Sequence, residues 1–431
     1  MIDLIIHGVN LPDGRSNCDI AIVNGSIEKI APAIDTPAKE EIQAVGCLAT
    51  PPFVDSHFHL DAALTYGQPR INQSVTLLEG ITLWGELKPH LTIDDIKARA
   101  EKLCHWAIAR GTLAIRSHVD ISDDRLLAVR ALLEVQRQFK PFLDIQLVAF
   151  PQDGYFRQSG SPNNLVRALD MGVDVVGGIP HFERTMAEGA KSVTALCELA
   201  AERGLAVDMH CDESDDPLSR HIETLIFETK RLGLAGQVTG SHLTSMHSMD
   251  NYYVSKLLPL MQEADVHAVA NPLINITLQG RHDTYPKRRG MTRVRELLAA
   301  GINVSFGHDC VMDPWYSLGS HDMLEVAHMG MHVAQMTGTT EMKQIFDAVT
   351  QNGARTLGLE GYGLEPGCHA DLVILQAANI HEALRLQPVR LYVIRRGRVI
   401  SRTQPAIARL CLADETVEVD FRHATTLRPS H

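Results

Sequence analysis

The sequence predicts a (β/α)8 TIM barrel, an α/β fold, with a small β-sandwich domain formed from both ends of the chain. Between residues 51 and 365, short apolar runs alternate with helical stretches, which is the pattern of repeated βα units and a parallel sheet. Outside this region, apolar and polar residues alternate as they do in half-buried strands. Eight βα units in about 310 residues fit a closed barrel of eight parallel strands.

Residues 1–50 and 366–431 are expected to form the small β domain together. The segment AIVNGSIEKI places Asn24 and Gly25 between two alternating runs, a strong signal for a two-residue type I′ hairpin. Near the other end, ADLVIL and LYVIRRGRVI return to alternation, so we expect the tail to pair with the N-terminal strands. Residues 422–431 (RHATTLRPSH) are expected to be loosely ordered.

Residues 51–365 are expected to form the barrel. Stretches such as DDIKARAEKLCHWAIARG and TRVRELLAAG are predicted to be helices that separate its strands. The apolar runs between the helical stretches are the eight expected strands: Phe53–His59, Thr112–Asp120, Asp144–Gln152, Val173–His181, Ala206–His210, Gln237–His242, Val266–Asn271 and Asn303–Asp309.

The composition excludes several classes of protein. The 431 residues include 40 Lys and Arg against 52 Asp and Glu, a formal net charge of −12, and no long basic run, which argues against a nucleic-acid partner. No apolar stretch reaches the roughly 20 residues of a membrane span, and the N-terminus lacks a signal-peptide pattern, so we expect a cytoplasmic protein without a membrane partner. Eight widely spaced cysteines without a C-x-x-C pair fit reduced thiols.

Polar residues terminate nearly all of the expected strands, which is where a barrel of this type carries its chemistry. His57 and His59 are two residues apart, so strand alternation points both imidazoles to the same side. His210, His242 and Asp309 end three other strands and would add two nitrogens and a carboxylate around the same axis. Imidazole and carboxylate ligands suit Zn²⁺ or Fe²⁺, so the pattern predicts a divalent metal site.

Several segments resemble bacterial cytosine deaminases of the amidohydrolase superfamily. These segments are SHFHLD (56–61), AFPQDG (149–154), VVGGIPHFE (175–183), HCDESDD (210–216), SHLTSMHS (241–248), NPLINITLQGRHDTYPKRRGMTRV (271–294), FGHDCVMDPWY (306–316) and GCHADLVIL (367–375). The resemblance covers nearly the whole chain. It implies that one divalent metal ion, Zn or Fe, is bound by four of the five strand-end residues, namely His57, His59, His210 and Asp309.

The same resemblance implies hydrolytic deamination of a free pyrimidine base at C4, with release of ammonia, as in pyrimidine salvage. The metal would make hydroxide available at neutral pH. Glu213 would carry a proton to the ring nitrogen N3, and Asp309 would pass a proton from the attacking water to the departing amine. His242 would orient the nucleophile and stabilise the tetrahedral intermediate.

Four further residues are expected to contact the base. Gln152 carries an amide that can donate to O2 and accept from N1–H, and Trp315 and Phe150 would wall an apolar slot. Cys310 follows Asp309 in GHDC, where cytosine deaminases typically have GHDD, and its smaller, less polar side chain leaves room for a methyl group at C5. We therefore predict deamination of 5-methylcytosine to thymine, with cytosine to uracil as the weaker or comparable activity, and acceptance of 5-fluorocytosine.

The sequence leaves other functions open. Gln152 reads only a generic amide-like edge, so isoguanine or creatinine are alternative substrates. Cyclic-amide hydrolases with two metal ions carry a carboxylated lysine on the fourth strand, and residues 173–184 contain no lysine, although Glu183 could bridge two metals. A metal-binding barrel without turnover is disfavoured by Glu213, and the H-x-E deaminases by the absence of P-C-x-x-C.

Two further expectations complete the prediction. Family members of this type form homo-oligomers, so the resemblance implies a homo-oligomer here. The remaining polar residues near the strand ends are expected to support the site rather than to react: His118, Asp120, His181, Glu183, Asn271 and Asn275.

Overall fold

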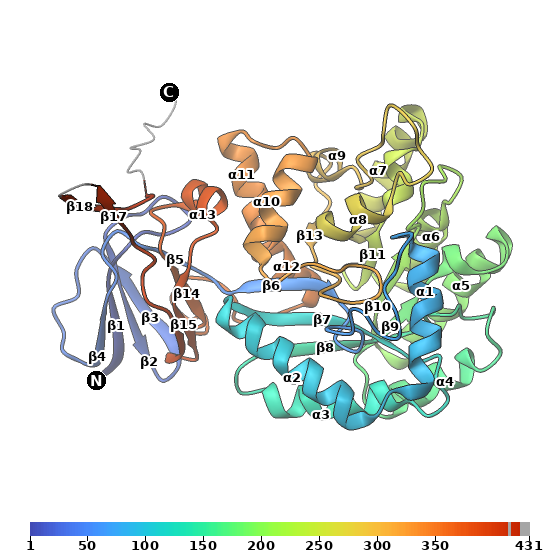
Figure 1. Ribbon diagram of the computed structural model, residues 1–431, viewed down its shortest axis with the longest axis horizontal. Helices are drawn as coiled ribbons and strands as arrows, with labels where there is room; N and C mark the ends of the chain where they lie inside the picture. Colours follow the sequence, from blue (N-terminus) through green and yellow to red (C-terminus); the bar gives the residue numbers. More distant parts are fainter. Residues whose placement is uncertain (413–414, 423–431) are drawn as a thin grey trace.

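A computed structural model describes residues 1–412 and 415–422, and its central element is a sheet of eight parallel strands in chain order (Figure 1). The strands are β6 (Phe53–Phe58), β7 (Thr112–Asp120), β8 (Asp144–Phe150), β9 (Val175–Gly178), β10 (Ala206–Cys211), β11 (Val238–His242), β12 (His267–Ala270) and β13 (Val304–Phe306). β6 and β13 meet at a bridge between Phe58 and Asp309, where the N–H of His59 donates to the carbonyl of Asp309. The predicted TIM barrel is confirmed, and site residues form its closing seam.

Helices surround the barrel (Figure 1). They are α1 (Leu77–Leu87), η1 (Lys88–His90), α2 (Ile93–Ala109), α3 (Leu127–Phe139), α4 (Ser161–Asp170), η2 (Pro180–Phe182), α5 (Met186–Arg203), α6 (His221–Leu232), η3 (Thr244–His247), α7 (Asn251–Ala264), α8 (Pro272–Leu278), α9 (Val294–Ala299), α10 (Met323–Val333), α11 (Thr339–Ala348), α12 (Gln351–Leu357) and α13 (Ile380–Leu386). In α2, a stretch predicted to be helical, the Thr92 hydroxyl caps the first turn and Ile96, Ala100 and Leu103 bury one face.

Five barrel strands end one to three residues earlier than predicted, and in three of them a proline follows within two residues of the strand end. Pro151, Pro180 and Pro272 have no N–H with which to continue the hydrogen-bonded ladder after β8, β9 and β12. The last two prolines instead begin η2 and α8. As a result, His181 lies on η2, and Asn271 directly precedes α8, so neither belongs to a strand.

The ends of the chain form two four-stranded sheets, with strand orders β3-β2-β1-β4 and β16-β15-β14-β5. The strands are β1 (Ile2–Val9), β2 (Cys18–Val23), β3 (Ser26–Ala31), β4 (Ala38–Gln43), β5 (Leu48–Thr50), β14 (Leu372–Leu375), β15 (Arg390–Arg395) and β16 (Arg398–Arg402). The predicted pairing between the two ends is therefore confirmed for β5, whereas β1 to β4 form a sheet with one another and meet the tail at an isolated bridge between Ser26 and His369. β5 pairs with β14 and leads, after Pro51 and Pro52, into the first barrel strand.

The two end sheets share one apolar core, which is separate from the core of the barrel. This core joins Ile6 and Ile22 of the first sheet to Ile374 and Ile394 of the second. Both sheets lie side by side at one end of the molecule in Figure 1. The small β-sandwich predicted from both chain ends is confirmed.

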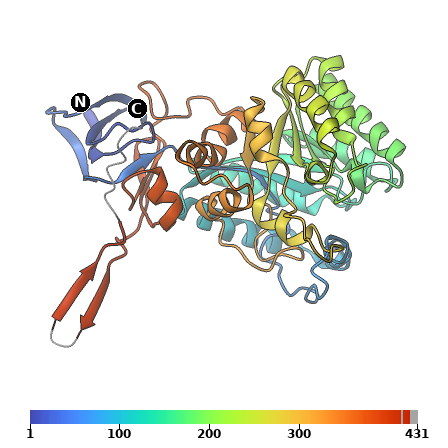
Figure 2. The ribbon, with the colours of Figure 1, turned by 90° about the horizontal axis from the view of Figure 1, so that it is seen from above.

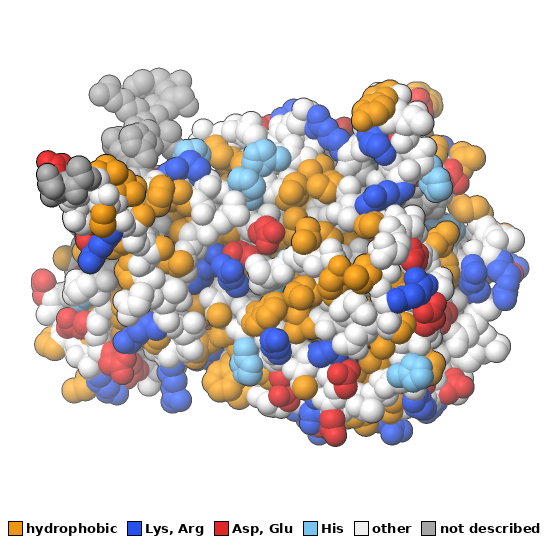
Figure 3. Space-filling view, in the orientation of Figure 1, with side chains coloured by type: hydrophobic (Ala, Val, Ile, Leu, Met, Phe, Trp, Pro, Cys, Tyr) orange, Lys and Arg blue, Asp and Glu red, His pale blue; other side chains and the backbone are white. Residues whose placement is uncertain are grey.

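The predicted hairpin at Asn24 and Gly25 is confirmed, with φ values of +51° and +78° and antiparallel pairing of β2 with β3. A second hairpin, β17 (Ala408–Leu412) with β18 (Glu415–Val419), extends away from the rest of the chain in Figure 2. The expectation for residues 422–431 falls, after Arg422, outside the described residues. Among the described residues, no helix is long and apolar enough to span a membrane. Basic and acidic side chains are interspersed on the face in Figure 3.

Candidate active site

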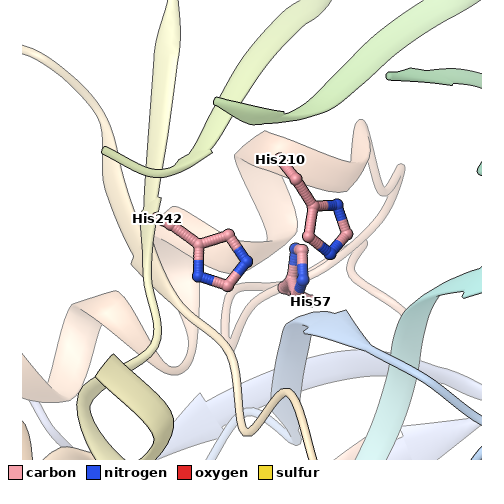
Figure 4. Close-up of side chains that lie close together, drawn as sticks. All are labelled: His57, His210 and His242. Carbon is pink, nitrogen blue, oxygen red and sulfur yellow. The ribbon is translucent and has the colours of Figure 1, made fainter. Parts of the chain in front are cut away.

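The carboxyl ends of four barrel strands bring the predicted ligands together. Figure 4 shows His57, His210 and His242, which come from β6, β10 and β11, with their rings close to one another. The ligand atoms of these three lie within 4.8 Å of one another, and those of His57, His59 and Asp309 form a second such group. Because the two groups share His57, all five strand-end residues converge on one region.

The distances within this cluster match a small coordination sphere. His59 Nε2 lies 3.1 Å from His210 Nε2, and Asp309 Oδ1 lies 3.4 Å from His59 Nε2 and 3.6 Å from His57 Nε2. Ligand atoms held at about 2.0–2.1 Å from a tetrahedral metal ion are about 3.4 Å apart. The donor set therefore fits a divalent cation such as Zn²⁺ or Fe²⁺.

The imidazoles of the cluster are neutral and keep free lone pairs. Burial lowers the pKa of His57 and His210 well below the usual value and lowers the pKa of His59 to about 4. Both ring nitrogens of His57 and Nδ1 of His210 are buried without a hydrogen-bond partner among the described residues. Buried polar atoms are seldom left unpaired, and a cation in the cluster would satisfy those that face it.

Backbone geometry at the strand ends holds the cluster in place. His242 and Asp309 adopt left-handed conformations, with φ values of +70° and +69°. Such conformations are unusual for residues with a side chain and persist where the surrounding structure enforces them. Asp55 Oδ1 accepts the N–H groups of His57 and His308, at 3.2 and 3.0 Å, and so ties the first strand to the segment that carries Asp309.

Glu213 and His242 stand beside the cluster as a pair. Burial raises the pKa of Glu213 to about 8, so this carboxyl group holds a proton at neutral pH. Its Oε1 lies 3.5 Å from His242 Nδ1, and the amide nitrogens of Asn275 and Asn271 lie 3.0 and 3.3 Å from the same atom. Amide NH₂ groups only donate, so His242 Nδ1 accepts and the ring proton resides on Nε2, which lies 3.7 Å from Asp309 Oδ2.

A cavity opens directly above the cluster. Three of the four predicted substrate contacts line it: Gln152, Cys310 and Trp315. The fourth, Phe150, is fully buried and is not part of the lining, because its ring stacks on His210 with the centroids 4.0 Å apart. The remaining wall residues, which the sequence analysis did not identify, are Leu77, Ile179, Ile274 and Leu278. The cavity thus combines apolar walls with few polar groups, as small-molecule sites do.

Cys310 is buried at the edge of this cavity, with 3 % of its surface exposed. Its Sγ lies 3.6 Å from Asp309 Oδ1, directly beside a predicted metal ligand. Burial and the neighbouring carboxylates of Asp309 and Asp313 raise the pKa of Cys310 well above its usual value. The side chain is therefore a neutral thiol at physiological pH.

Helix α1 covers the cavity, and the sequence carried no signal that it belongs to the site. Leu77 lies in its first turn and lines the cavity, and Gly80 lies directly beneath the indole of Trp315. At the other end of the helix, Trp84 Nε1 donates to Asp120 Oδ2 at 2.7 Å, and Lys88 Nζ lies 3.1 Å from the same oxygen. Asp120 therefore supports the site by fastening α1 to the end of β7.

A third group of potential metal ligands lies deeper in the barrel and consists of His57, His118 and Asp208. Arg116 Nη1 already contacts Asp208 Oδ2 at 3.0 Å, and His118 Nε2 lies 3.7 Å from the other oxygen of Asp208. A cation placed there would face the guanidinium charge at close range in a buried setting. This group is therefore a poor second cation site, and His118 serves as a buried neighbour of His57.

A family model described as "Amidohydrolase family" matches residues 40–401, which is most of the chain. The chain belongs to the amidohydrolase family. This amidohydrolase is an enzyme, a metal-dependent aminohydrolase, and the superfamily's use of a divalent metal agrees with the histidine and aspartate cluster.

Three relatives place this amidohydrolase among enzymes of heterocycles. A solved structure of 5-methylcytosine deaminase from Klebsiella pneumoniae, liganded with 5-fluorocytosine, is 42% identical, has a TM-score of 0.92 and covers 94% of this chain and 99% of its own. N-isopropylammelide isopropyl amidohydrolase of Pseudomonas sp. (strain ADP) is 31% identical over 94% of this chain and 99% of its own. Pterin deaminase of Rhizobium rhizogenes is 27% identical over 91% of this chain and 90% of its own.

Proposed function

We propose that this amidohydrolase deaminates a free aminopyrimidine, converting 5-methylcytosine to thymine and, with weaker or comparable efficiency, cytosine to uracil. The observation that carries the substrate choice is the neutral, buried thiol of Cys310 in the cavity beside Asp309. The 42% identity to a 5-methylcytosine deaminase across 94% of the chain supports the same choice. We also expect 5-fluorocytosine to be accepted, because fluorine is smaller than the methyl group.

We assign the metal ion to His57, His59, His210 and Asp309, because two overlapping groups of ligand atoms share His57 and because His59 Nε2 lies 3.1 Å from His210 Nε2 and 3.4 Å from Asp309 Oδ1. When bound, the ion supplies hydroxide at neutral pH by lowering the pKa of water from 15.7 to about 7. His242 is left out of this set because its Nδ1 is held by two amides and its Nε2–H points toward Asp309. Elemental analysis of the purified protein distinguishes Zn from Fe.

The side chains around the cavity provide the proton transfers of the reaction. Glu213, protonated at neutral pH, donates to ring nitrogen N3 as C4 is attacked, and it takes back the remaining proton from the hydroxyl group that has become bonded to C4. Asp309 receives the proton of the attacking water and delivers it to the amino group, which leaves as ammonia. His242 donates through Nε2 to the oxygen that becomes bonded to C4, and Gln152 donates to O2 and accepts from N1–H.

The decisive experiment compares kcat/KM for cytosine and 5-methylcytosine in the native protein and in Cys310→Asp. A carboxylate at this position would have to be desolvated against the C5 methyl group, so the preference for the methylated base should fall by about 10- to 200-fold. Cys310→Ser is the matched control, because it keeps a small neutral side chain and should leave the ratio near the native value. An inert methylated base in the native protein, or an unchanged ratio in Cys310→Asp, would refute the assignment of specificity.

A second candidate is deamination of another amino-substituted ring, such as isoguanine or creatinine. The relatives named for N-isopropylammelide and for pterin support this second candidate, because their names give ring substrates other than cytosine. Ammonia release from a panel of these rings separates the two candidates. Cyclic-amide hydrolysis through two metal ions has less support, since no lysine lies on β9 or in the turn that follows it. The cytoplasmic location and the homo-oligomer stay predictions, which fractionation and sedimentation test.

A further inference from the structure

The segment that carries Gln152 is a loop, residues 151–160, between β8 and α4. Gln152 lines the cavity, and among the described residues its side-chain amide has no hydrogen-bond partner. The amide is therefore free to bind a substrate, but a loop alone does not fix its position. Lys88 and Ser122 hold Asp153, next to Gln152, and a second support of the loop comes from the segment that follows the neighbouring strand β9.

Glu183 supplies that support with both oxygens of its carboxylate. Oε1 accepts the N–H groups of Tyr155 and Phe156, at 2.6 and 3.0 Å, and Oε2 accepts the N–H of Arg157 at 2.8 Å. Three consecutive amides thus converge on one side chain that is 8 % exposed. Hydrogen bonds to a carboxylate are about twice as strong as neutral ones, so this contact is a strong attachment of the loop, beside those that Asp153 makes with Lys88 Nζ and Ser122 Oγ.

Further contacts also attach the Gln152 loop to the segment that carries Glu183. The Arg157 guanidinium lies over the ring of Phe182, 4.3 Å from its centroid, and Arg157 Nη1 donates to the Phe182 carbonyl at 3.2 Å. Arg184 Nη2 donates back to the Arg157 carbonyl at 3.0 Å. Between Gln152 and the clamped segment, Gly154 makes a tight turn with φ of +93° and its N–H on the Pro151 carbonyl. Only two residues separate Gln152 from the first clamped amide.

The same hydrogen bonds argue against Glu183 as a ligand of a second metal ion. Glu183 was the one acidic residue after β9 that could have bridged two ions. Both of its oxygens are directed to backbone N–H groups of the loop. Placing the carboxylate on a cation would leave three amides without their acceptor, which is costly for the buried ones.

We propose that Glu183 is a positioning residue, which acts on the substrate through Gln152 by clamping the Gln152 loop. The inference rests on the proposed function in one respect, namely that Gln152 binds the ring edge. Loss of the clamp lets the Gln152 amide move by an ångström or more, and a misplacement of about that size costs on the order of 10²-fold in a bound complex. Neither the metal cluster nor Glu213 contacts Glu183, so the loss falls on substrate binding.

The test is a double-mutant cycle on KM with Glu183→Ala and Gln152→Ala. Glu183→Ala should raise KM by about 10- to 100-fold, with kcat within about 3-fold of native and unchanged metal content. In the Gln152→Ala background the same substitution should have little further effect, because the group it positions is gone. Glu183→Gln, which keeps Oε1 for two of the three amides, should fall between native and alanine. Additive effects in the cycle, or a loss confined to kcat, would overturn the proposal.

Glu228→Ala is the matched control. Glu228 is a buried glutamate, 3 % exposed, that accepts from Thr194 Oγ1 and Arg231 Nε on the outer helices α5 and α6. It should lower stability and leave KM near native. If Glu228→Ala raises KM as much as Glu183→Ala, the effect reflects general destabilisation and the positioning role is wrong.

Hydrogen exchange keeps this inference separable from the proposed function. The amides of Tyr155, Phe156 and Arg157 should exchange slowly in the native protein and at least 10-fold faster in Glu183→Ala, whatever the substrate is. Retained protection in Glu183→Ala would overturn the clamp itself. If Glu183→Ala removes the protection of these amides but the native protein does not deaminate pyrimidines, the proposed function is wrong and the positioning role of Glu183 stands. The double-mutant cycle on KM is then measured with the ring compound that the protein does deaminate.

Discussion

Replacing Gly80 by alanine should impair substrate turnover without disturbing the metal site. A Cβ at this position of α1 would lie 2.3 Å from Cδ1 and 2.5 Å from Nε1 of Trp315. Ordinary contacts begin near 3.4 Å, so the indole or the helix has to move by about 1.1 Å. Trp315 lines the cavity, and Leu77 on the same helix lines it too, so either movement changes the space that holds the ring.

The expected size of the effect follows from that displacement. A misplacement of about 1 Å costs up to roughly 10²-fold, so kcat/KM should fall by about 10- to 100-fold in a steady-state assay of ammonia release. Metal content, measured by elemental analysis, should stay native, because the atoms nearest to the added Cβ belong to Trp315 and not to a predicted ligand.

Gly85 provides the matched control on the same helix. A Cβ there meets no atom within 4 Å, so Gly85→Ala should keep native activity. It should also raise the free energy of unfolding by about 1 kcal/mol, because alanine favours the helix over glycine. Native kcat/KM in Gly80→Ala, or an equal loss in Gly85→Ala, would refute the reasoning.

Glu213→Gln should lower kcat by about 10²–10⁴-fold with the metal still bound, since it removes a positioned proton carrier, and near-native turnover would contradict that role. A chelator should abolish deamination, Zn²⁺ or Fe²⁺ should restore it, and His57→Ala should fail to retain one metal ion per chain. Burial lowers the pKa of His267 from 6.5 to about 4, so the unfolded chain takes up a proton in this pH window that the folded chain does not. His267 alone should therefore lower the free energy of unfolding by up to about 3 kcal/mol as the pH drops from 6.5 to 4. In urea titrations His267→Phe should flatten that slope, and an unchanged slope would count against the assignment.

The fold was largely predictable because its elements are encoded in short-range patterns. Each of the eight predicted barrel strands exists, and the Asn24-Gly25 turn forms the predicted hairpin. The errors concern strand ends, which a nearby proline can shift, and strand pairing, which depends on residues far away in the sequence. Pro151 and Pro180 shortened two strands through a missing N–H, and β1 to β4 formed their own sheet, which meets the tail at an isolated bridge between Ser26 and His369.

The site was predictable to the extent that barrel strands end at a common face. His57, His210, His242 and Asp309 were identified from strand ends alone, and the structure brings them together. The ring of Phe150 shows the limit of the method, since the sequence could not tell a cavity wall from a side chain stacked behind His210. The roles of these residues in binding and catalysis stay predictions.

The sequence by itself determined the barrel, its strand-end histidines and the thiol beside Asp309, because alternation and local turn chemistry act between residues close in the chain. The tertiary structure decided which groups meet across long separations, such as Glu183 with the Gln152 loop and Gly80 with Trp315. Those contacts depend on how the helices and loops pack over the barrel mouth, and the free energy of that packing is shared among many side chains at once. No local sequence pattern predicts these long-range contacts, so only the folded structure reveals them.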